Sequence, residues 1–316
     1  MIQNWRGTGE RALVRHILGI LGEVVEDDCA IIDIGDEYIV ATTDMLHRKT
    51  DFPEPITPWQ MGWMTVAVNL SDIAAMGARP LGLLIATGIP RTADLAFVSE
   101  LVSGIRDCAE AYGTVILGGD LDSHDELTLV GSALGCIEKD LVIRRRGARV
   151  GDLLCTTGFL GSAGAGLRLL QEGVGAENEL TRKLLEPVPR LSEGRALAKS
   201  RSVTSMMDNS DGLALSLYDL AEASGVGFVV EEDLLPMLPA VRDIARDETD
   251  LLDLLVHSGG DFELLFTVKP DGINSARGAC SFTVVGRAVE KGIWLESSGT
   301  RREIVPAGYE HRIFGP

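Results

Sequence analysis

Short acidic motifs recur through an otherwise apolar, glycine-rich sequence. They are Glu26-Asp27-Asp28-Cys29-Ala30, Thr42-Thr43-Asp44-Met45, Asn69-Leu70-Ser71-Asp72, Gly118-Gly119-Asp120 and Asp208-Asn209-Ser210-Asp211-Gly212. Carboxylates are hard oxygen ligands, and Mg²⁺ bound by a few of them keeps water and phosphate oxygens as its other ligands. Because the sequence has no G-x-x-x-x-G-K-[ST] motif, these acids predict a site that holds polyphosphate through metal. That chemistry indicates phosphoryl transfer from a nucleotide.

The strongest local signal is the pair Asp208 and Asp211, which flanks Ser210 where a strand is expected to lead into a helix. Ser210 or Asp211 could simply cap that helix, because a side-chain oxygen at this position accepts a backbone N–H. One acidic residue would suffice for a cap. Two of them therefore favour metal or phosphate binding.

Asp44 and Asp72 form a second candidate pair. Thr42-Thr43-Asp44 closes an apolar strand, where turn chemistry alone is the alternative interpretation. Asp72 lies inside an apolar helix, where burying a carboxylate without a partner is costly. Sharing a metal ion with Asp44 would relieve that cost.

The remaining motifs are weaker when each is taken alone. Asp27 and Asp28 could be solvated surface charge. The two glycines before Asp120 could let backbone amides approach a phosphate closely. Arg145, in the run Arg144-Arg145-Arg146, could neutralise phosphate charge or could be solvated.

The hydrophobic pattern predicts the elements that position these residues, in an α+β first half and a second half of similar rhythm. In the first half we expect helices at 9–25, 59–76 and 93–112 and strands at 29–34, 38–43, 81–88, 114–117 and 127–137. The strands at 29–34 and 38–43 are mostly apolar, which predicts burial on both faces. In the second half we expect strands at 153–157, 227–230, 264–268 and 282–288, and helices ending at 171, at 192–199 and at 213–223.

Length and composition limit the domain organisation and the partners. With 316 residues the chain is long enough for two domains, and the polar junction at Arg144-Arg145-Arg146-Gly147 predicts a boundary between 1–143 and 144–316. The net charge of −18 disfavours nucleic acid and anionic membranes as partners. Five scattered cysteines without a C-x-x-C pair, and an N-terminus without a basic and apolar leader, predict a cytoplasmic protein.

Taken together and in this order, the motifs resemble those of the thiamine-monophosphate kinases. That family belongs to the ATP-binding superfamily of aminoimidazole ribonucleotide synthetase and selenophosphate synthetase. The resemblance runs nearly from end to end of the chain. Besides the acidic motifs it covers the block 67–78, the stretch Ser258-Gly259-Gly260-Asp261-Phe262-Glu263 and the terminal Gly308-Tyr309-Glu310-His311. These three features separate the family from its relatives.

The resemblance implies an aminoimidazole ribonucleotide synthetase-like fold. Its N-terminal α+β domain would pair its sheet with that of a second subunit in a homodimer, and its C-terminal α/β domain would close over ATP. It implies a Mg²⁺ site built from Asp27, Asp28, Thr42, Thr43, Asp44, Asp72, Asp120, Asp208 and Asp211. It also implies nucleotide contacts from Gly119, Asp120, Arg145 and Ser210, and thiamine monophosphate contacts from Asp51, Asp261 and Tyr309. Asp261 is the substitute here for a glutamate of the family pattern, which is one residue longer.

The reaction implied is direct in-line attack by thiamine monophosphate on the γ-phosphorus of ATP, which yields thiamine diphosphate and ADP. No catalytic base or nucleophile is expected, because the attacking phosphate is already ionised and such transfer depends on positioning and charge neutralisation. Two alternatives are an enzyme of the same fold with a different acceptor and a catalytically silent nucleotide-binding paralogue. Retention of all the principal acidic motifs argues against the silent paralogue.

Overall fold

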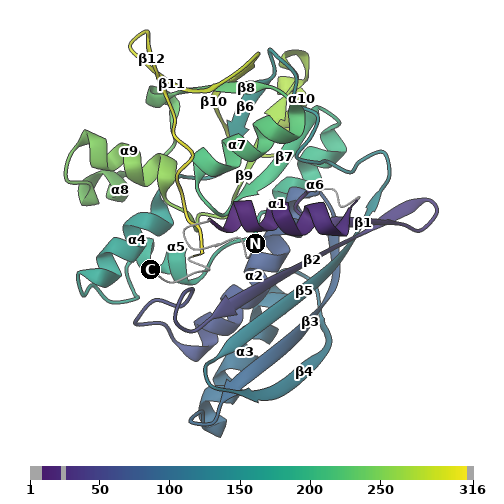
Figure 1. Cartoon of the computed structure of the whole chain (residues 1–316), viewed down its shortest axis with the longest axis vertical. Helices are drawn as coiled ribbons and strands as arrows, with labels where there is room; N and C mark the ends of the chain where they lie inside the picture. Colours follow the sequence, from purple (N-terminus) through teal and green to yellow (C-terminus); the bar gives the residue numbers. More distant parts are fainter. Residues whose placement is uncertain (1–8, 23–25, 312–316) are drawn as a thin grey trace, which may run out of the picture.

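The computed structural model describes residues 9–22 and 26–311, which form two β-sheets with a long helix between them (Figure 1). The helices are α1 (Glu10–Leu21), α2 (Pro58–Ala75), α3 (Leu95–Ala111), α4 (Ser162–Gln171), α5 (Glu179–Leu185), α6 (Leu191–Ser200), α7 (Leu213–Ser224), α8 (Pro239–Ile244), α9 (Glu248–His257) and α10 (Ile273–Ala279). The strands are β1 (Ala30–Asp33), β2 (Glu37–His47), β3 (Arg79–Pro90), β4 (Ile116–His124), β5 (Thr128–Glu138), β6 (Leu153–Thr156), β7 (Val203–Asn209), β8 (Gly227–Glu231), β9 (Glu263–Val268), β10 (Thr283–Val289), β11 (Ile293–Ser297) and β12 (Thr300–Glu303). The α+β class expected from the sequence is confirmed.

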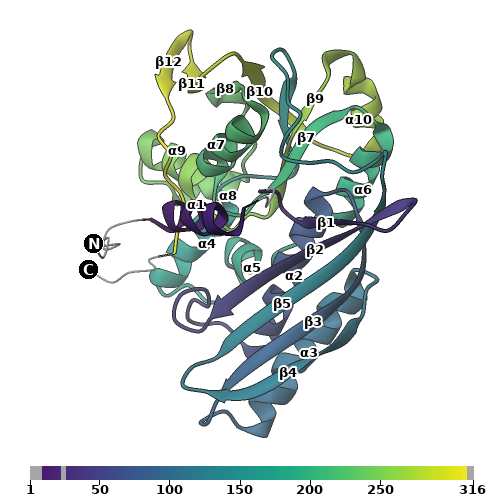
Figure 2. The ribbon, with the colours of Figure 1, turned by 45° about the vertical axis from the view of Figure 1, so that its right-hand side comes forward.

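The first sheet has the strand order β1-β2-β5-β3-β4, and only its β3–β4 pair is parallel. Helices α2 and α3 cover one face of it, and no element of the described chain covers the other (Figures 1 and 2). Along β2, Val40 is fully buried, whereas Thr43 and Met45 are exposed. The prediction that the first two strands are buried on both faces is therefore wrong. An antiparallel sheet with helices on one side exposes every second side chain on the other side.

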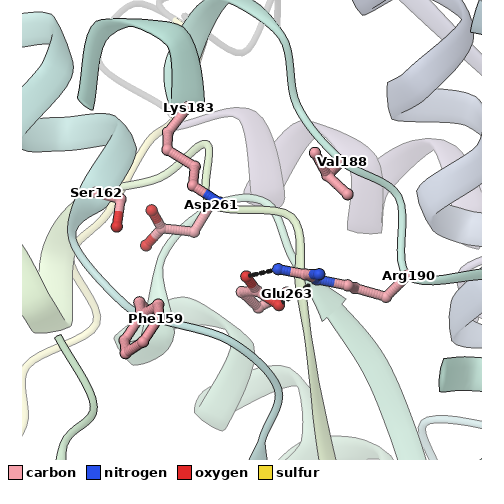
Figure 3. A pocket seen from close by; sticks show the side chains of 7 residues that line it. All are labelled: Phe159, Ser162, Lys183, Val188, Arg190, Asp261 and Glu263. Atoms are coloured by element: carbon pink, nitrogen blue, oxygen red, sulfur yellow. Dashed lines mark hydrogen bonds and ion pairs between the residues drawn. The ribbon is translucent and has the colours of Figure 1, made fainter. Parts of the chain in front are cut away.

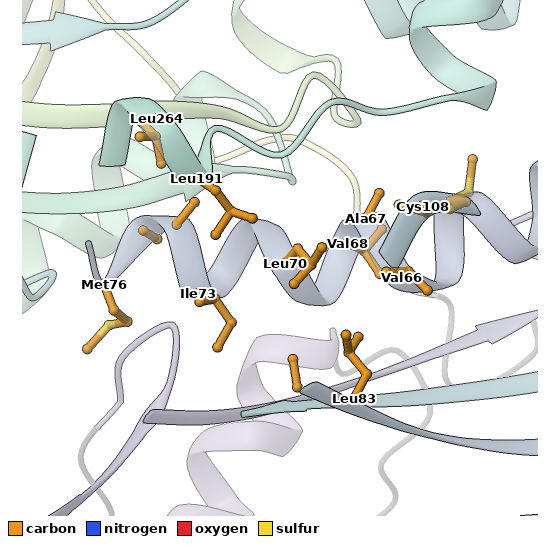
Figure 4. Close-up of a cluster of buried hydrophobic side chains, with 14 of the residues drawn as sticks. Val66, Ala67, Val68, Leu70, Ile73, Met76, Leu83, Cys108, Leu191 and Leu264 are labelled. Carbon is orange, nitrogen blue, oxygen red and sulfur yellow. The ribbon is translucent and has the colours of Figure 1, made fainter. Parts of the chain in front are cut away.

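The long helix α2 is buried on nearly all sides, which explains its uniformly apolar sequence. It begins with a capping box between Thr57 and Gln60, and Pro58 occupies its first turn. On one side α2 packs against β2, β5 and α3, and on the other it packs against α6 and β7 of the second half. Figure 4 shows Leu70 and Ile73 between Leu83 of the first sheet and Leu191 of α6. This central position brings the acidic residue of α2 to the junction of the two halves.

Two glycines set the distance between α2 and α3. A Cβ atom at Gly62 would lie 2.1 Å from the carbonyl oxygen of Leu101, and one at Gly104 would lie 1.9 Å from that of Trp59. No side chain fits at either position without moving the helices apart. Close packing of α3 against α2 in turn fixes where α2 lies on the sheet.

The second sheet has the order β12-β11-β8-β10-β6-β9-β7, with a parallel β8–β11 pair. As expected, a strand leads through the Asp208–Asp211 motif into a helix, here β7 into α7. The N-cap of α7 is Gly212, and no described side chain caps the helix. The capping interpretation of Ser210 and Asp211 is therefore wrong, which leaves both side chains for other roles.

Several short elements of the second half were not expected from the sequence. They are α5, α8, α9, α10, β11 and β12. The helices α5, α8 and α10 have only six or seven residues, too few for a clear period. All residues of β12, Thr300–Glu303, are exposed, so this strand has no apolar pattern.

The strand expected at 114–117 was predicted to end before Gly118-Gly119-Asp120, and this prediction is wrong. Strand β4 runs through the motif to His124 and pairs with β3. A Cβ atom at Gly119 would lie 1.8 Å from the carbonyl oxygen of Ile85, so the glycine permits close approach of the two strands. The helix expected at 9–25 ends at Leu21, and residues 23–25 lie outside the described residues.

Candidate active site

Three buried or half-buried carboxylates meet where the two halves of the chain join. Asp28 precedes β1, Asp72 lies on α2, and Asp208 is near the end of β7. Each offers a carboxylate oxygen within 4.8 Å of the oxygens offered by the other two. The sequence separates Asp72 from Asp208 by more than a hundred residues, and contacts of α2 with β7 bring them together.

Neighbouring side chains hold these carboxylates in place. Thr42 Oγ1 donates a hydrogen bond to Asp72, and Ser71 Oγ donates one of 2.6 Å to Asp208. Arg145 Nη2 donates a bond of 2.9 Å to Asp28 Oδ1, and the ion pair is nearly enclosed, with Asp28 fully buried. The guanidinium of Arg145 thus offsets part of the negative charge of the site.

Asp27 and Thr43 lie beside this cluster but make other contacts. Asp27 Oδ1 accepts a hydrogen bond of 3.1 Å from the backbone N–H of Arg145. Thr43 Oγ1 donates one of 2.8 Å to the carbonyl oxygen of Gly131, on the exposed face of the sheet. The hydroxyl of Thr43 therefore points away from Asp44 and Thr42, which alternate with it along β2.

The pKa values of the clustered carboxyls are raised, chiefly by burial and then by one another. The pKa of Asp208 rises to about 7, with the charge of Asp28 as the next cause. The pKa of Asp44 rises to about 6, with the charge of Asp211 as the next cause. Asp72 has a pKa well above its ordinary value, with Asp44 and Asp208 as the largest charged neighbours. Mutual repulsion of this kind is relieved by a bound cation.

The donor set fits a divalent metal ion. Asp28 Oδ2 is buried and accepts no hydrogen bond from the described residues, so one carboxylate oxygen has a lone pair facing the cluster without a protein partner. Hard oxygen donors from several carboxylates are the ligands that Mg²⁺ selects. Six of the nine expected metal ligands interact electrostatically as one group: Asp27, Asp28, Asp44, Asp72, Asp208 and Asp211.

The raised pKa values predict how stability depends on pH without metal. A carboxyl whose pKa is higher in the folded protein than its unfolded value of 3.8 stabilises the fold at low pH. That contribution is lost as the pH rises through about 6 and about 7. We expect the Tm in EDTA to fall from about pH 5 to about pH 8, and Mg²⁺ to restore more at the higher pH.

Thermal denaturation of the wild type and of Asp208→Asn at several pH values tests this expectation. The variant lacks one of the shifted carboxyls, so its Tm in EDTA should depend less steeply on pH. A wild-type Tm in EDTA that is flat or rises over the same range would contradict the assignment of raised pKa values.

A polar cavity of about 160 Å³ adjoins the cluster. Arg145 and Ser210, both expected nucleotide contacts, line it together with Asp211, Asp219 and Arg11. The Nε atom of Arg145 is buried and has no hydrogen-bond partner among the described residues. Glu10, Glu26 and Glu310 line it as well, and Arg11 is paired with Asp219 and Asp211. An anionic ligand in this cavity would therefore need a bound cation as its counter-charge.

The structure does not bring Gly119 and Asp120 to this cluster within one chain. Both lie on β4, which is separated from β2 by β5 and β3. Three inter-strand spacings amount to about 14 Å, too far for Asp120 to share a metal ion with Asp44 of β2. Asp120 is exposed at the edge of the sheet, and it lines a surface hollow with Met45 and His47.

Two of the expected acceptor contacts, Asp51 and Tyr309, do meet. The hydroxyl of Tyr309 lies 3.2 Å from Asp51 Oδ1, and Asp51 Oδ2 accepts a bond of 2.7 Å from the backbone N–H of His47. These residues join the N-terminal half to the last segment of the chain. Burial raises the pKa of the Tyr309 hydroxyl, with the charge of Asp51 as the second cause.

The third expected acceptor contact, Asp261, faces a different neighbourhood. Its carboxylate accepts hydrogen bonds of 2.6 Å and 2.9 Å from the backbone N–H groups of Gly161 and Ala163 at the start of α4. Burial raises its pKa to about 7. Figure 3 shows Asp261 in a small cavity with Lys183 and with the ion pair of Glu263 and Arg190. Asp261 thus holds the loop 258–262 against α4.

Two sets of ion pairs near the site were not predicted from the sequence. Arg11 of α1 donates hydrogen bonds to Asp219 and Asp211, and Arg190 forms a two-bond ion pair with Glu263. A single arginine in an amphipathic helix gives no signal of such a contact. The motif Gly259-Gly260-Asp261-Phe262-Glu263 could have indicated Glu263, but its partner Arg190 lies far away in sequence.

Comparisons with known proteins show which family this chain belongs to. Residues 26–137 match the family model "AIR synthase related protein, N-terminal domain", and residues 149–294 match "AIR synthase related protein, C-terminal domain". The thiamine-monophosphate kinase of Methanospirillum hungatei is 40% identical over 96% of this chain and 99% of its own length. The chain belongs to the thiamine-monophosphate kinase family.

Other thiamine-monophosphate kinases support the same assignment. The enzyme of Archaeoglobus fulgidus is 36% identical over 95% of both chains. The solved structure of AaThiL complexed with AMPPCP and TMP has a TM-score of 0.89 and 26% sequence identity, and it covers 98% of this chain and 99% of its own. The family and the two-domain fold implied by the sequence motifs are thereby confirmed. No helix in the described part of the chain has the length and hydropathy to span a membrane.

Proposed function

We propose that this thiamine-monophosphate kinase transfers the γ-phosphoryl group of ATP to thiamine monophosphate, in the presence of Mg²⁺, to give thiamine diphosphate and ADP. The observation that carries the proposal is the meeting of Asp28, Asp72 and Asp208 beside the cavity that Arg145 and Ser210 line. Relatives named thiamine-monophosphate kinase cover nearly the whole chain. A solved relative of the same fold holds AMPPCP and TMP.

The proposed metal ligands are the carboxylates of the cluster. Asp28, Asp72 and Asp208 stand at its centre, Asp44 and Asp211 adjoin it, and Asp27, Thr42 and Thr43 lie at its edge. Mg²⁺ bound there would neutralise charge on the transferred phosphoryl group. Neighbouring side chains hold the carboxylates in place for the metal ion. Thr42 donates a hydrogen bond to Asp72, Ser71 donates one to Asp208, and Arg145 donates one to Asp28.

The proposed substrate contacts divide between two sides of the cluster. Arg145 and Ser210 bind the nucleotide phosphates from the cavity side. Asp51 and Tyr309 bind thiamine monophosphate on the other side, with Asp261 acting through the loop 258–262 that it holds. No described residue needs to act as a base, because the attacking phosphate is ionised at neutral pH.

We propose further that the chain forms a homodimer through the uncovered face and edge of its first sheet, and that Gly119 and Asp120 serve the nucleotide site of the partner subunit. Every residue of β4 is exposed, and large apolar side chains gather on this surface: Met45, Leu84 and Leu117. An apolar patch of this kind marks an interface. Light scattering on the purified protein tests the proposal, and a monomer would overturn it.

We place the enzyme in the cytoplasm, which its five free cysteines favour.

A coupled assay for ADP release tests the reaction. ATP and Mg²⁺ are supplied with thiamine monophosphate in one reaction and with thiamine in a second. We expect ADP and thiamine diphosphate only with the monophosphate. ADP release without thiamine diphosphate would favour another acceptor for the same fold. Failure of turnover while ATP and Mg²⁺ still raise the Tm would favour a nucleotide-binding paralogue.

A further inference from the structure

The two ends of the described chain meet beside the proposed site. Helix α1 lies across the junction of the two halves, next to the last residues (Figures 1 and 2). None of its residues is buried, and Ile17, Ile20 and Leu21 are exposed. Apolar packing therefore contributes little to holding α1 in this place. Its polar side chains make the contacts that do.

Arg11 of α1 contacts carboxylates from three separate parts of the chain. Its guanidinium donates to Asp219 of α7 through both terminal nitrogens, with Nη2 at 3.0 Å from Oδ2. The same Nη2 lies 3.4 Å from Asp211 Oδ2, and Nε lies 3.6 Å from Glu310 Oε1. The planar guanidinium group of arginine has five N–H donors, so one arginine can pair with several carboxylates at once.

The C-terminal segment, residues 305–311, is the element that Arg11 secures. Glu10 assists, because its carboxylate accepts a bond of 2.9 Å from the backbone N–H of His311. Tyr309 directly precedes the two anchored residues Glu310 and His311, and its backbone N–H donates a bond of 3.0 Å to the carbonyl oxygen of Asp211. The Tyr309 hydroxyl lies within 3.2 Å of Asp51. His311 also reaches the N-terminal half, because its Nε2 lies 3.8 Å from Asp51 Oδ1. The contacts at Glu310 and His311 thus fix the end of the segment that faces Asp51.

Close packing leaves the segment little freedom once these contacts are made. A Cβ atom at Gly308 would lie 2.4 Å from the carbonyl oxygen of Asp211, and one at Gly259 would lie 3.0 Å from Cβ of Tyr309. The segment therefore passes directly over the Asp208–Asp211 loop. Displacement of Glu310 by a few ångströms would move Tyr309 away from Asp51.

We propose that Arg11 is a positioning residue for the acceptor side of the site: by holding Glu310 beside Asp211 and Asp219, it places Tyr309 against Asp51 and so sets the affinity for thiamine monophosphate. The proposal rests on the proposed function for the identity of the acceptor. The guanidinium of Arg11 is taken up by the three carboxylates. One of these is Asp211, an outer member of the proposed metal site, which keeps its carboxylate when Arg11 is replaced. If α1 served only to stabilise the fold, its charged residues Glu10 and Arg11 would not both need to contact the segment 305–311.

Steady-state kinetics of Arg11→Met test the proposal. We expect the KM for thiamine monophosphate to rise about tenfold, while kcat and the KM for ATP change by less than about threefold. Arg11→Lys should recover part of the loss, because a single ammonium can still pair with one or two of the carboxylates. Arg15→Met is the matched control, since Arg15 is on the same helix, is exposed and makes no ion pair among the described residues. It should behave as the wild type.

A double-mutant cycle with Glu310→Gln separates positioning through the segment from other effects. If Arg11 acts through Glu310, Arg11→Met combined with Glu310→Gln should raise the KM for thiamine monophosphate no more than Arg11→Met alone. Additive effects would overturn the proposal. So would equal rises in both KM values, or a fall in kcat alone, because a fold or metal defect gives those results.

Hydrogen exchange tests the same contacts without turnover. In Arg11→Met the amides of Tyr309 and His311 should exchange faster than in the wild type and in Arg15→Met. Unchanged exchange would overturn the positioning role. If the wild type released no ADP with thiamine monophosphate, the proposed function would fail and the acceptor assignment with it. The exchange data would then still decide whether Arg11 holds the segment.

Discussion

Asp44→Asn is expected to lower kcat by at least about a thousandfold, because the variant keeps the size of the side chain but removes one anionic ligand from the proposed metal site. Asp44 lies on β2, and its raised pKa reports burial and the nearby charge of Asp211. The fold should persist. Removal of a carboxylate that repels its neighbours does not destabilise the protein without metal, and its Tm in EDTA at about pH 8 should equal or exceed that of the wild type.

The measurement is ADP release at saturating thiamine monophosphate over a range of Mg²⁺ concentrations. The matched control is Asp243→Asn, which changes an exposed aspartate of α8 outside the site. Asp243→Asn should retain the wild-type rate. Near-normal turnover in Asp44→Asn would show that this carboxylate is not part of the catalytic metal site.

The types of residue at the site could be predicted from the sequence. Which of these residues lie close together in the fold could be predicted only in part. An aspartate inside the apolar helix α2 is costly unless something pairs with it, and this pointed to Asp72 with Asp44 as its partner. In the structure Asp72 lies in a cluster with Asp28 and Asp208. Which acids it meets depends on α2 packing against β7 of the other half. No local pattern encodes that contact, because it arises from apolar side chains that could equally face another helix.

Asp120 shows that the strand order of the sheet decides which residues can share a site. In the sequence Gly118-Gly119-Asp120 has the same appearance as the other acidic turns, and it was assigned to the same metal site. The order β2-β5-β3-β4 places it at the far edge of the sheet. Strand order depends on which apolar faces pair, and periodicity does not report it. The motif therefore predicted the residue type and not its partner, and a contact of Asp120 with the site of a second subunit stays a proposal.

Arg11 and Glu263 were missed for a related reason. Each is one charged residue at the boundary of a regular element, and such residues are usually solvated. Their partners lie far away in sequence: Asp219 for Arg11 and Arg190 for Glu263. Ion pairs between distant segments leave no spacing to recognise. The structure is needed to see that both pairs hold loops that border the site.

Arg190→Met is expected to lower the free energy of unfolding by about 3–5 kcal/mol, because it leaves the carboxylate of Glu263 buried and without a counter-charge. Arg190 donates to Glu263 through Nε at 2.6 Å and through Nη2 at 2.5 Å, and the Glu263 side chain is only 6% exposed. Thr157 Oγ1, which donates a bond of 2.7 Å, would be its one remaining side-chain partner among the described residues.

Urea denaturation measures this loss, and two further variants define its cause. Arg182→Met removes a pair with Glu177 that is largely exposed, so it should cost no more than about 1 kcal/mol. Arg190→Met combined with Glu263→Leu removes both charges and should be more stable than Arg190→Met alone, because no unpaired carboxylate remains buried. If Arg190→Met cost as little as Arg182→Met, the carboxylate of Glu263 would have to be reached by water or protonated. The loop 258–262 would then be held by the two hydrogen bonds of Asp261 and by those that the backbone N–H groups of Gly260 and Phe262 donate to carbonyl oxygens at the end of β7 and directly after it.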